Sequence, residues 1–160
     1  MPSFYSSILS KNRNIFSINA CIAAEKPFIA KFRIFNALSG SLTEMNKLHM
    51  QRIDYESKSN QMKLLYIPCF SLNTILSAIN VTKVDYFSLD VEGGELSVLK
   101  SIKYDKITIE TLSIEHNNYD DVKQKIISHL KANRFINVES TKDSIDVYFK
   151  RNASSAKQSH

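Results

Sequence analysis

Two short polar segments of the chain contain the residue types that acid–base chemistry needs. The first is Asp90-Val91-Glu92-Gly93-Gly94-Glu95, which combines three carboxylates with two glycines, and the second is Glu115-His116-Asn117. A positioned carboxylate or imidazole can take a proton from a hydroxyl group or return one. The candidate catalytic residues are therefore Asp90, Glu92, Glu115 and His116.

Each segment directly follows an apolar run that predicts a β-strand. These runs are Val84–Leu89 and Ile107–Ile114, and a helix-like run, Glu95–Ile102, overlaps the end of the first segment. In an open α/β sheet, ligands bind outside the carboxyl ends of parallel strands. The two segments should therefore lie at the same edge of adjacent parallel strands. We expect one of Asp90 and Glu92 to face the ligand while the other fixes the turn.

A simpler interpretation stays open for the same residues. Glu92 and Glu95 would then only stabilise the start of the following helix, whose dipole favours negative charge there. His116 would be a surface histidine beside a helix cap, and His49 and His129 are both predicted to be solvated. No spacing in the sequence indicates a metal site, so none is predicted.

The composition is that of one ordinary globular domain. The 160 residues are 43% hydrophobic and 23% charged, and the net charge is +5 with scattered lysines, which does not favour a nucleic-acid partner. No apolar run has the length of a membrane span, and the N-terminus has no signal-peptide pattern, so the default location is cytoplasmic. Only three glycines occur, with no G-x-G, so no glycine-rich phosphate loop is present.

Two further motifs leave alternatives open. Cys21 and Cys69 are not at metal-ligand spacing, and we interpret them as small buried side chains. A single disulfide is the alternative if the parent protein is secretory. Asn80-Val81-Thr82 and Asn152-Ala153-Ser154 match the N-glycosylation pattern, which also arises often by chance.

The rest of the chain completes an alternating order of elements. Such an order predicts an α/β fold with a mostly parallel sheet covered by helices and closed by an antiparallel hairpin. Residues 1–150 should form the domain and residues 151–160 a flexible polar tail. The other expected helices are at 2–11, 44–53, 72–79 (capped by Ser71) and 120–133. The other expected strands are at 15–23 and 28–35, which we expect to pair as a hairpin, at 62–70, with strand character up to Pro68, and at 135–140 and 144–149.

Several of these segments together resemble a known family. Residues Val84–Leu99 resemble the central motif of FkbM-type methyltransferase domains; their sequence is V-D-Y-F-S-L-D-V-E-G-G-E-L-S-V-L. Within that family, they resemble the Star-like animal subgroup in particular. The segments Ile67–Leu72, Ile114–Asn117 and Leu130–Phe135 also fit that family. The resemblance covers nearly the whole chain.

The resemblance implies a fold, a cofactor and a reaction. The fold would be the Rossmann-like one of class I enzymes that use S-adenosylmethionine, and the reaction would be methyl transfer to an oxygen of a small molecule or glycan. The adenine of the cofactor would lie near Cys21 and Ile22. The family's first two strands, with their glycine-rich loop and ribose-binding acid, find no match here. We therefore expect an incomplete domain in which Val84–Leu89 lacks one neighbour, or alternatively a non-catalytic interaction or trafficking module.

Overall fold

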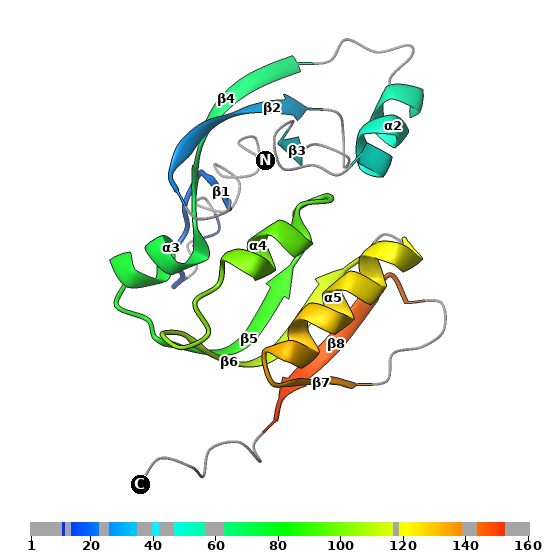
Figure 1. The fold of residues 1–160 in the computed structure, drawn as a ribbon. Helices are drawn as coiled ribbons and strands as arrows, with labels where there is room; N and C mark the ends of the chain where they lie inside the picture. The colour runs from blue at the N-terminus through cyan, green and yellow to red at the C-terminus, as the bar shows by residue number, and fades with distance from the viewer. Residues whose placement is uncertain are drawn as a thin grey trace, which may run out of the picture.

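The structure is a computed structural model in which two four-stranded sheets lie one above the other (Figure 1). It describes residues 11, 14–22, 26–34, 40–41, 47–56, 63–116, 119–138 and 144–152. The first sheet, which we call the N-terminal sheet, has the strand order β1-β4-β2-β3. Its elements are β1 (Cys21–Ile22), β2 (Phe28–Ile34), β3 (Gly40–Ser41) and β4 (Lys63–Phe70), with helix α2 (Lys47–Glu56) between β3 and β4.

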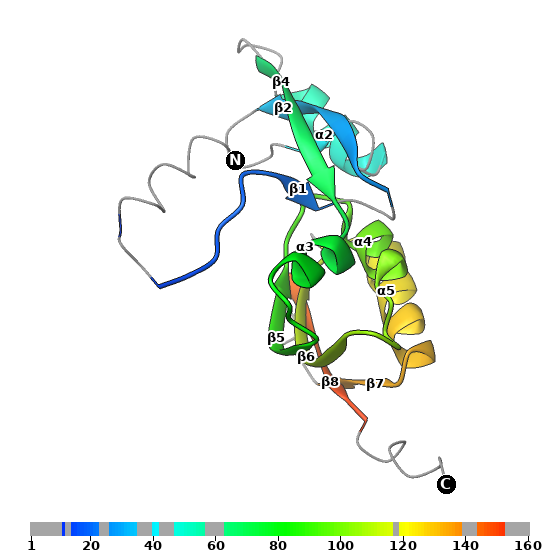
Figure 2. The ribbon, with the colours of Figure 1, turned by 90° about the vertical axis from the view of Figure 1, so that its left-hand side faces the viewer.

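The second sheet, the C-terminal sheet, has the strand order β5-β6-β8-β7. Strands β5 and β6 are parallel, whereas β8 is antiparallel to both β6 and β7. Helices α4 and α5 lie on the same face of this sheet, as the two perpendicular views show (Figures 1 and 2). The elements are α3 (Leu72–Ala78), β5 (Lys83–Leu89), α4 (Glu95–Ser101), β6 (Thr108–Glu115), α5 (Asp120–Ala132), β7 (Phe135–Val138) and β8 (Asp146–Arg151).

The expected α/β class is confirmed, but the expected single, mostly parallel sheet is wrong. Among the described strands, parallel pairing is confined to β1–β4 and β5–β6, and the other pairs are antiparallel. Strand β5 ends its sheet, because no described strand pairs with its other edge. The strands before α3 therefore form a sheet of their own. The closing hairpin of β7 and β8 is antiparallel, as the sequence predicts.

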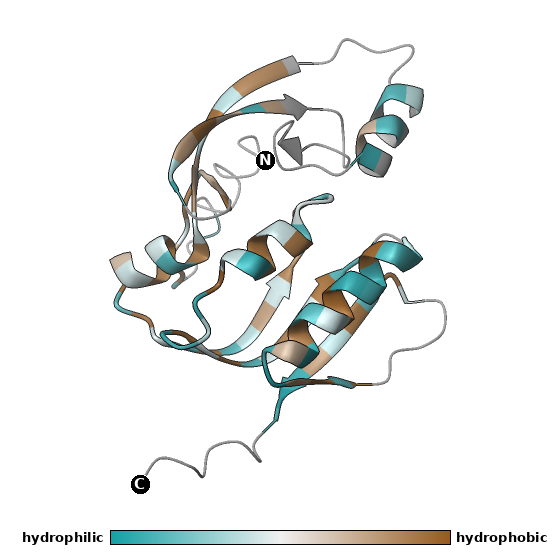
Figure 3. Ribbon diagram, viewed as in Figure 1, coloured by the Kyte–Doolittle hydropathy of each residue, from teal (hydrophilic) through white to brown (hydrophobic). Residues whose placement is uncertain are grey.

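The main hydrophobic core belongs to the C-terminal sheet and its helices. Among the described residues, fourteen buried apolar ones belong to this core, including Leu99, Leu112 and Phe149. Helix α5 contributes Ile126 and Leu130 to this core, while the side turned to the viewer in Figure 3 is mostly hydrophilic. This arrangement is what an amphipathic helix with one apolar stripe produces.

Helix α3, which connects the two sheets along the chain, begins as predicted at Ser71. The Ser71 hydroxyl accepts a hydrogen bond from the Thr74 backbone N–H at 3.1 Å. A serine at this position satisfies one of the backbone donors that a helix start leaves unpaired. The cap therefore sets the point at which β4 ends and the helix begins.

Strand β4 lies between β1 and β2, so the predicted hairpin of residues 15–23 with 28–35 is wrong. β1 pairs with β4 in parallel and β2 pairs with β4 in antiparallel fashion. The strand also continues through Pro68 to Phe70. Proline lacks an N–H and is usually confined to strand edges. It is tolerated here because β1 reaches only Cys69 and Phe70, which leaves the β1 side of Pro68 without a strand partner.

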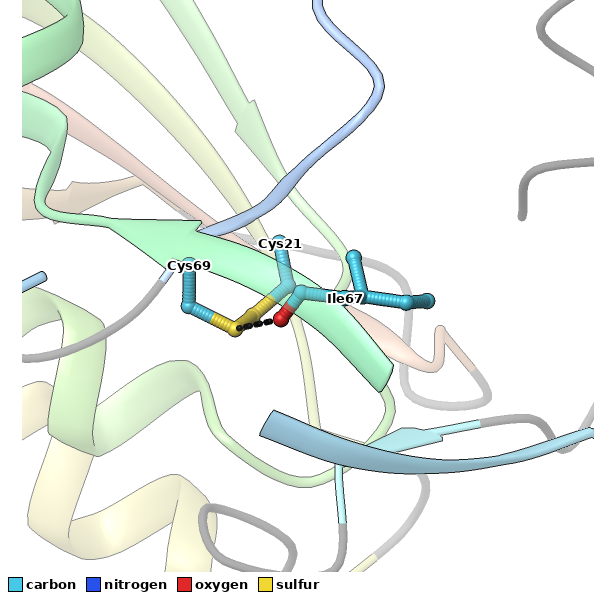
Figure 4. Close-up of a disulfide and its surroundings, with 3 residues drawn as sticks. All are labelled: Cys21, Ile67 and Cys69. Atoms are coloured by element: carbon cyan, nitrogen blue, oxygen red, sulfur yellow. Dashed lines mark hydrogen bonds between the residues drawn. A yellow bond between two sulfur atoms is a disulfide. The ribbon is translucent and has the colours of Figure 1, made fainter. Parts of the chain in front are cut away.

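The two cysteines form a disulfide between β1 and β4, which corrects their interpretation as independent buried side chains (Figure 4). Cys21 and Cys69 are direct partners in the strand register, with their Cα atoms 4.4 Å apart. The Cys69 Sγ also lies 3.5 Å from the Ile67 carbonyl oxygen. That approach is a contact rather than a hydrogen bond, since a disulfide sulfur carries no hydrogen. The two cysteines are bonded because β1 and β4 pair with each other. These strands are distant in sequence, so the sequence alone does not show that pairing.

Some predicted boundaries move, and others fall outside the described residues. Residues 2–10 of the first predicted helix and residues 153–160 of the predicted tail are not among them. Helix α2 continues to Glu56, beyond its predicted end at Ile53, and β8 includes Arg151, which we had placed in the tail. Among the described helices, none has both the length and the apolar character that a membrane-spanning segment requires.

Candidate functional site

The parallel pairing of β5 and β6 brings the carboxylates of the two polar segments together. Leu89 lies opposite Ile114 in the strand register, so Asp90 and Glu115 follow at the same edge of the sheet. Carboxylate oxygens of Asp90, Glu92 and Glu115 all lie within 4.8 Å of one another. We call these three residues the acidic cluster. The structure thus assembles three of the four predicted catalytic residues.

The turn that carries the cluster has an unusual backbone. Glu92 has φ 55° and Gly93 has φ 100°. Glycine adopts positive φ without steric cost, whereas a residue with a side chain does so at some cost in energy. The surrounding contacts must therefore hold Glu92 in this conformation.

Glu95 supplies those contacts. It is 2% exposed, and its Oε1 accepts hydrogen bonds from the backbone N–H groups of Val91 at 3.1 Å and Gly93 at 3.0 Å. A charged acceptor makes stronger hydrogen bonds than a neutral one. Glu95 therefore fixes the turn, and both of these bonds go to the turn before α4 rather than to the helix itself. Its place in the D-V-E-G-G-E motif was the only sequence signal for this role.

The acidic cluster changes the protonation of Glu115. Burial is the largest of the causes that together raise the pKa of Glu115 from its ordinary value of 4.5 to about 8, and a hydrogen bond with Asp90 acts in the same direction. The negative charges of Asp90, Glu92 and Glu95 add to the increase in pKa. A hydrogen bond between two carboxyl groups requires that one of them carry a proton. Near neutral pH, Glu115 therefore keeps a proton that it can donate to Asp90.

His116 follows Glu115 directly but lies in a different environment. Successive residues of a strand point to opposite sides of the sheet. His116 is 3% exposed, and the charged groups that act on its ring are Lys123, Asp120 and Asp146. Burial lowers the pKa of His116, and Lys123 contributes to the decrease. It is thus a buried residue facing α5 and β8 rather than a surface histidine, and its catalytic role stays a prediction.

The residues predicted near the cofactor lie in the N-terminal sheet. Cys21 is half-buried and its sulfur is bonded to Cys69. Ile22 is partly buried and packs against the core of the C-terminal sheet. These two residues therefore lie where the two parts of the chain approach each other, and their contact with a cofactor remains a prediction.

The other histidine predictions have separate outcomes. His129 is half-buried rather than solvated, because its Nε2 lies 3.2 Å from the Leu99 carbonyl oxygen and its ring approaches that of Tyr104. Burial lowers the pKa of His129. The side chain of His49 is outside the described part of the chain.

The acidic cluster can bind a cation and can exchange protons. Three carboxylates within 4.8 Å offer the hard oxygen ligands that Mg²⁺ and Ca²⁺ prefer, although exposed acidic groups often gather without an ion. The raised pKa of Glu115 gives the acidic cluster a carboxyl that can accept or release a proton near neutral pH.

A comparison with protein families identifies the chain. The model of the methyltransferase FkbM domain matches residues 4–151, which include every element of the two sheets. No curated protein and no solved structure matches the chain. The match covers most of the sequence and confirms the resemblance carried by the D-V-E-G-G-E segment. The chain belongs to the FkbM methyltransferase family.

Proposed function

We propose that this domain transfers a methyl group from S-adenosylmethionine to a hydroxyl oxygen, and that the acidic cluster accepts the proton which the hydroxyl loses. The observation that supports this proposal is the convergence of Asp90, Glu92 and Glu115 at the carboxyl edge of β5 and β6, where the pKa of Glu115 is raised. This edge is where α/β sheets bind their ligands. Membership in a methyltransferase family supports the reaction class.

The proton transfer follows from the charge state of the acidic cluster. A hydroxyl oxygen must lose its proton when it gains a methyl group. The raised pKa of Glu115, about 8, lies near neutral pH, where a general base can both accept and release a proton. Glu92 adds a negative charge that favours retention of the proton after it has been taken up.

The described residues fit one part of S-adenosylmethionine, its positively charged sulfur. S-adenosylmethionine would supply a methyl group carried on a positively charged sulfur, and a negatively charged cluster attracts such a group. Cys21 and Ile22 are proposed to lie near its adenine on the strength of the family resemblance. The sequence contains no G-x-G turn to bring backbone close to the cofactor. We therefore expect binding by this chain alone to be weaker than about −8 kcal/mol, the free energy of a dissociation constant of about 1 μM.

The direct test is transfer of a labelled methyl group from S-adenosylmethionine to a panel of small hydroxyl compounds and glycans. Asp90→Asn and Glu115→Gln should each reduce the rate by about 10²-fold or more, the usual effect of losing a general base. Asp85→Asn and Glu110→Gln are matched controls, because they lie on the same two strands with exposed side chains that pair with Lys83. These controls should leave the rate unchanged.

The product separates this proposal from its rivals. Methyl ethers on hydroxyl oxygens resist mild alkali, whereas methyl esters of carboxylates are hydrolysed. Alkali-stable label that mass spectrometry places on an acceptor oxygen would support O-methyl transfer to a hydroxyl. Equal rates for the site variants and the controls, or label found only on nitrogen or in esters, would contradict it.

A further inference from the structure

We infer that Asn80 is the acceptor for an N-linked glycan, on a chain that folds in an oxidising compartment. The inference concerns the turn between α3 and β5 and is independent of the proposed methyl transfer. Two observations carry it, and they come from different parts of the molecule. One is the exposed Asn80-Val81-Thr82 motif, and the other is the disulfide between Cys21 and Cys69.

The backbone of the turn is held in place while the Asn80 side chain remains exposed. Helix α3 is capped at Ile79, and Asn80 follows with φ 53°. The N–H of Asn80 donates to the Ser77 carbonyl at 3.2 Å, and the N–H of Val81 donates to the Leu76 carbonyl at 2.9 Å. These two bonds form the Schellman motif, in which asparagine is a tolerated left-handed residue. The backbone amides are thus satisfied without the side-chain amide of Asn80.

The helix end explains an asparagine at position 80 but not a hydroxyl two residues later. Thr82 takes part in the fold through its backbone, since its carbonyl accepts a hydrogen bond from the Thr108 N–H at 2.8 Å. Both Asn80 and Thr82 are exposed, and within the described residues neither side chain is hydrogen-bonded. The amide and hydroxyl that the N-x-[ST] pattern requires are therefore available to an enzyme.

The disulfide points to a compartment in which this modification takes place. Disulfides persist in secreted proteins and in the lumen of the secretory pathway, and they are rare where glutathione keeps thiols reduced. Cys69 is fully buried and joined to Cys21 across paired strands (Figure 4). The bond is therefore built into the N-terminal sheet rather than placed on its surface.

A glycan at Asn80 would leave the acidic cluster accessible. Asn80 precedes the first residue of β5, whereas Asp90 follows its last (Figure 1). A strand of seven residues separates the two positions by roughly 20 Å at about 3.3 Å per residue. The second motif differs, because the Asn152 backbone donates to the Arg134 carbonyl at 2.9 Å and the residues that follow are not described. The inference is confined to Asn80.

The modification is a group transfer with a lipid-linked sugar donor. The Nδ2 of Asn80 forms a bond to the anomeric carbon of an oligosaccharide carried on a polyprenyl diphosphate. The bond from that carbon to the diphosphate oxygen breaks, the diphosphate leaves with the electron pair, and the amide nitrogen loses one proton. No oxidant or reductant takes part.

The test uses the full natural protein recovered from the cells that make it. An amidase that removes N-glycans converts the modified asparagine to aspartate, and in heavy-oxygen water the product carries a mass label. Mass spectrometry should find the label at position 80 in chains whose Cys21 and Cys69 are joined. An unlabelled Asn80 in such chains would overturn the inference, as would free thiols at both cysteines.

Three variants separate loss of the glycan from loss of the fold. Thr82→Val and Asn80→Gly should both abolish the label at position 80, the first by removing the hydroxyl and the second by removing the acceptor. Glycine keeps the left-handed backbone of the turn, so Asn80→Gly should remain folded. Thr82→Ser preserves the motif and should retain the label. A label that persists in Thr82→Val, or is lost in Thr82→Ser with the protein still folded and secreted, would contradict the proposed site.

Discussion

The N-terminal and C-terminal sheets have the same number of strands but are stabilised by different means. In the part of the chain that the structure describes, fourteen buried apolar residues form the core of the C-terminal sheet and its helices. Among the described residues of the N-terminal sheet, the separate buried cluster consists of Ala30 and Cys69. The opposite face of that sheet leaves Ile29 63% and Tyr66 72% exposed.

This difference shows what each sheet depends on. Hydrophobic burial stabilises a sheet in proportion to the apolar area removed from water, and small assemblies remove little. The N-terminal sheet compensates with a covalent bond between β1 and β4. The acidic cluster lies in the sheet with the larger core, where rigid strands can hold carboxylates close together. Four predictions test the comparison, from the largest expected effect to the smallest.

Removal of one large core side chain should destabilise the C-terminal sheet most. Phe149→Ala should lower the free energy of unfolding by about 3–5 kcal/mol, because it removes buried contacts and leaves a cavity. Tyr148→Ala, at the neighbouring exposed position of β8, should cost much less. Urea unfolding measures both values. Equal losses would show that the core does not dominate the stability of this sheet.

Removal of the disulfide should affect the N-terminal sheet selectively. The bond closes a loop with a sequence separation of 48. The chain-entropy relation for such a loop gives about 4 kcal/mol, and engineered cases often show less, so we expect about 2–4 kcal/mol. In a Cys21→Ala, Cys69→Ala double variant, amide hydrogen exchange should accelerate in β2 and β4 and change little in β6. Equal acceleration in β6 would argue against separate modes of stabilisation.

The turn that carries the acidic cluster should depend on the Glu95 carboxylate. Glu95→Gln replaces a charged acceptor of two backbone N–H groups with a neutral one and should cost about 1–2 kcal/mol. The pKa of Glu115 should fall as well, because a nearby negative charge is removed. An NMR titration of Glu115 gives this second value. No change in either the stability or the titration would refute a positioning role for Glu95.

The smallest effect should be a change in how stability depends on pH. The pKa of Glu115 in the folded state, about 8, lies above its ordinary value of 4.5. Its contribution to stability is therefore complete below about pH 4.5 and is lost as the pH rises through about 8. Glu115→Gln stays neutral, so it should remove this decline and be relatively more stable than the parent above pH 8. Urea midpoints on both sides of this window, with Glu110→Gln as control, measure the difference.

Local patterns predicted much of the C-terminal sheet. Strand β5, helix α4 and strand β6 occur close to their expected ranges, because each combines a distinct periodicity with a clear start or stop signal. The Ser71 cap was readable for the same reason. The N-terminal sheet was harder to predict. Strands β1 and β2 are neighbours in sequence, yet β4 lies between them, because strand pairing depends on which distant segments meet.

The candidate site, too, was predictable from local sequence only in part. The sequence by itself placed Asp90, Glu92 and Glu115 at the ends of two strands, since strand–turn–helix order is written in local residue patterns. Only the tertiary structure decided that Glu115 lies beside Asp90 with a raised pKa, that His116 faces α5 and β8 instead, and that Cys21 is bonded to Cys69. Protonation, side-chain orientation and disulfide pairing depend on distances between residues that are remote in sequence, and those distances exist only once the sheets have formed.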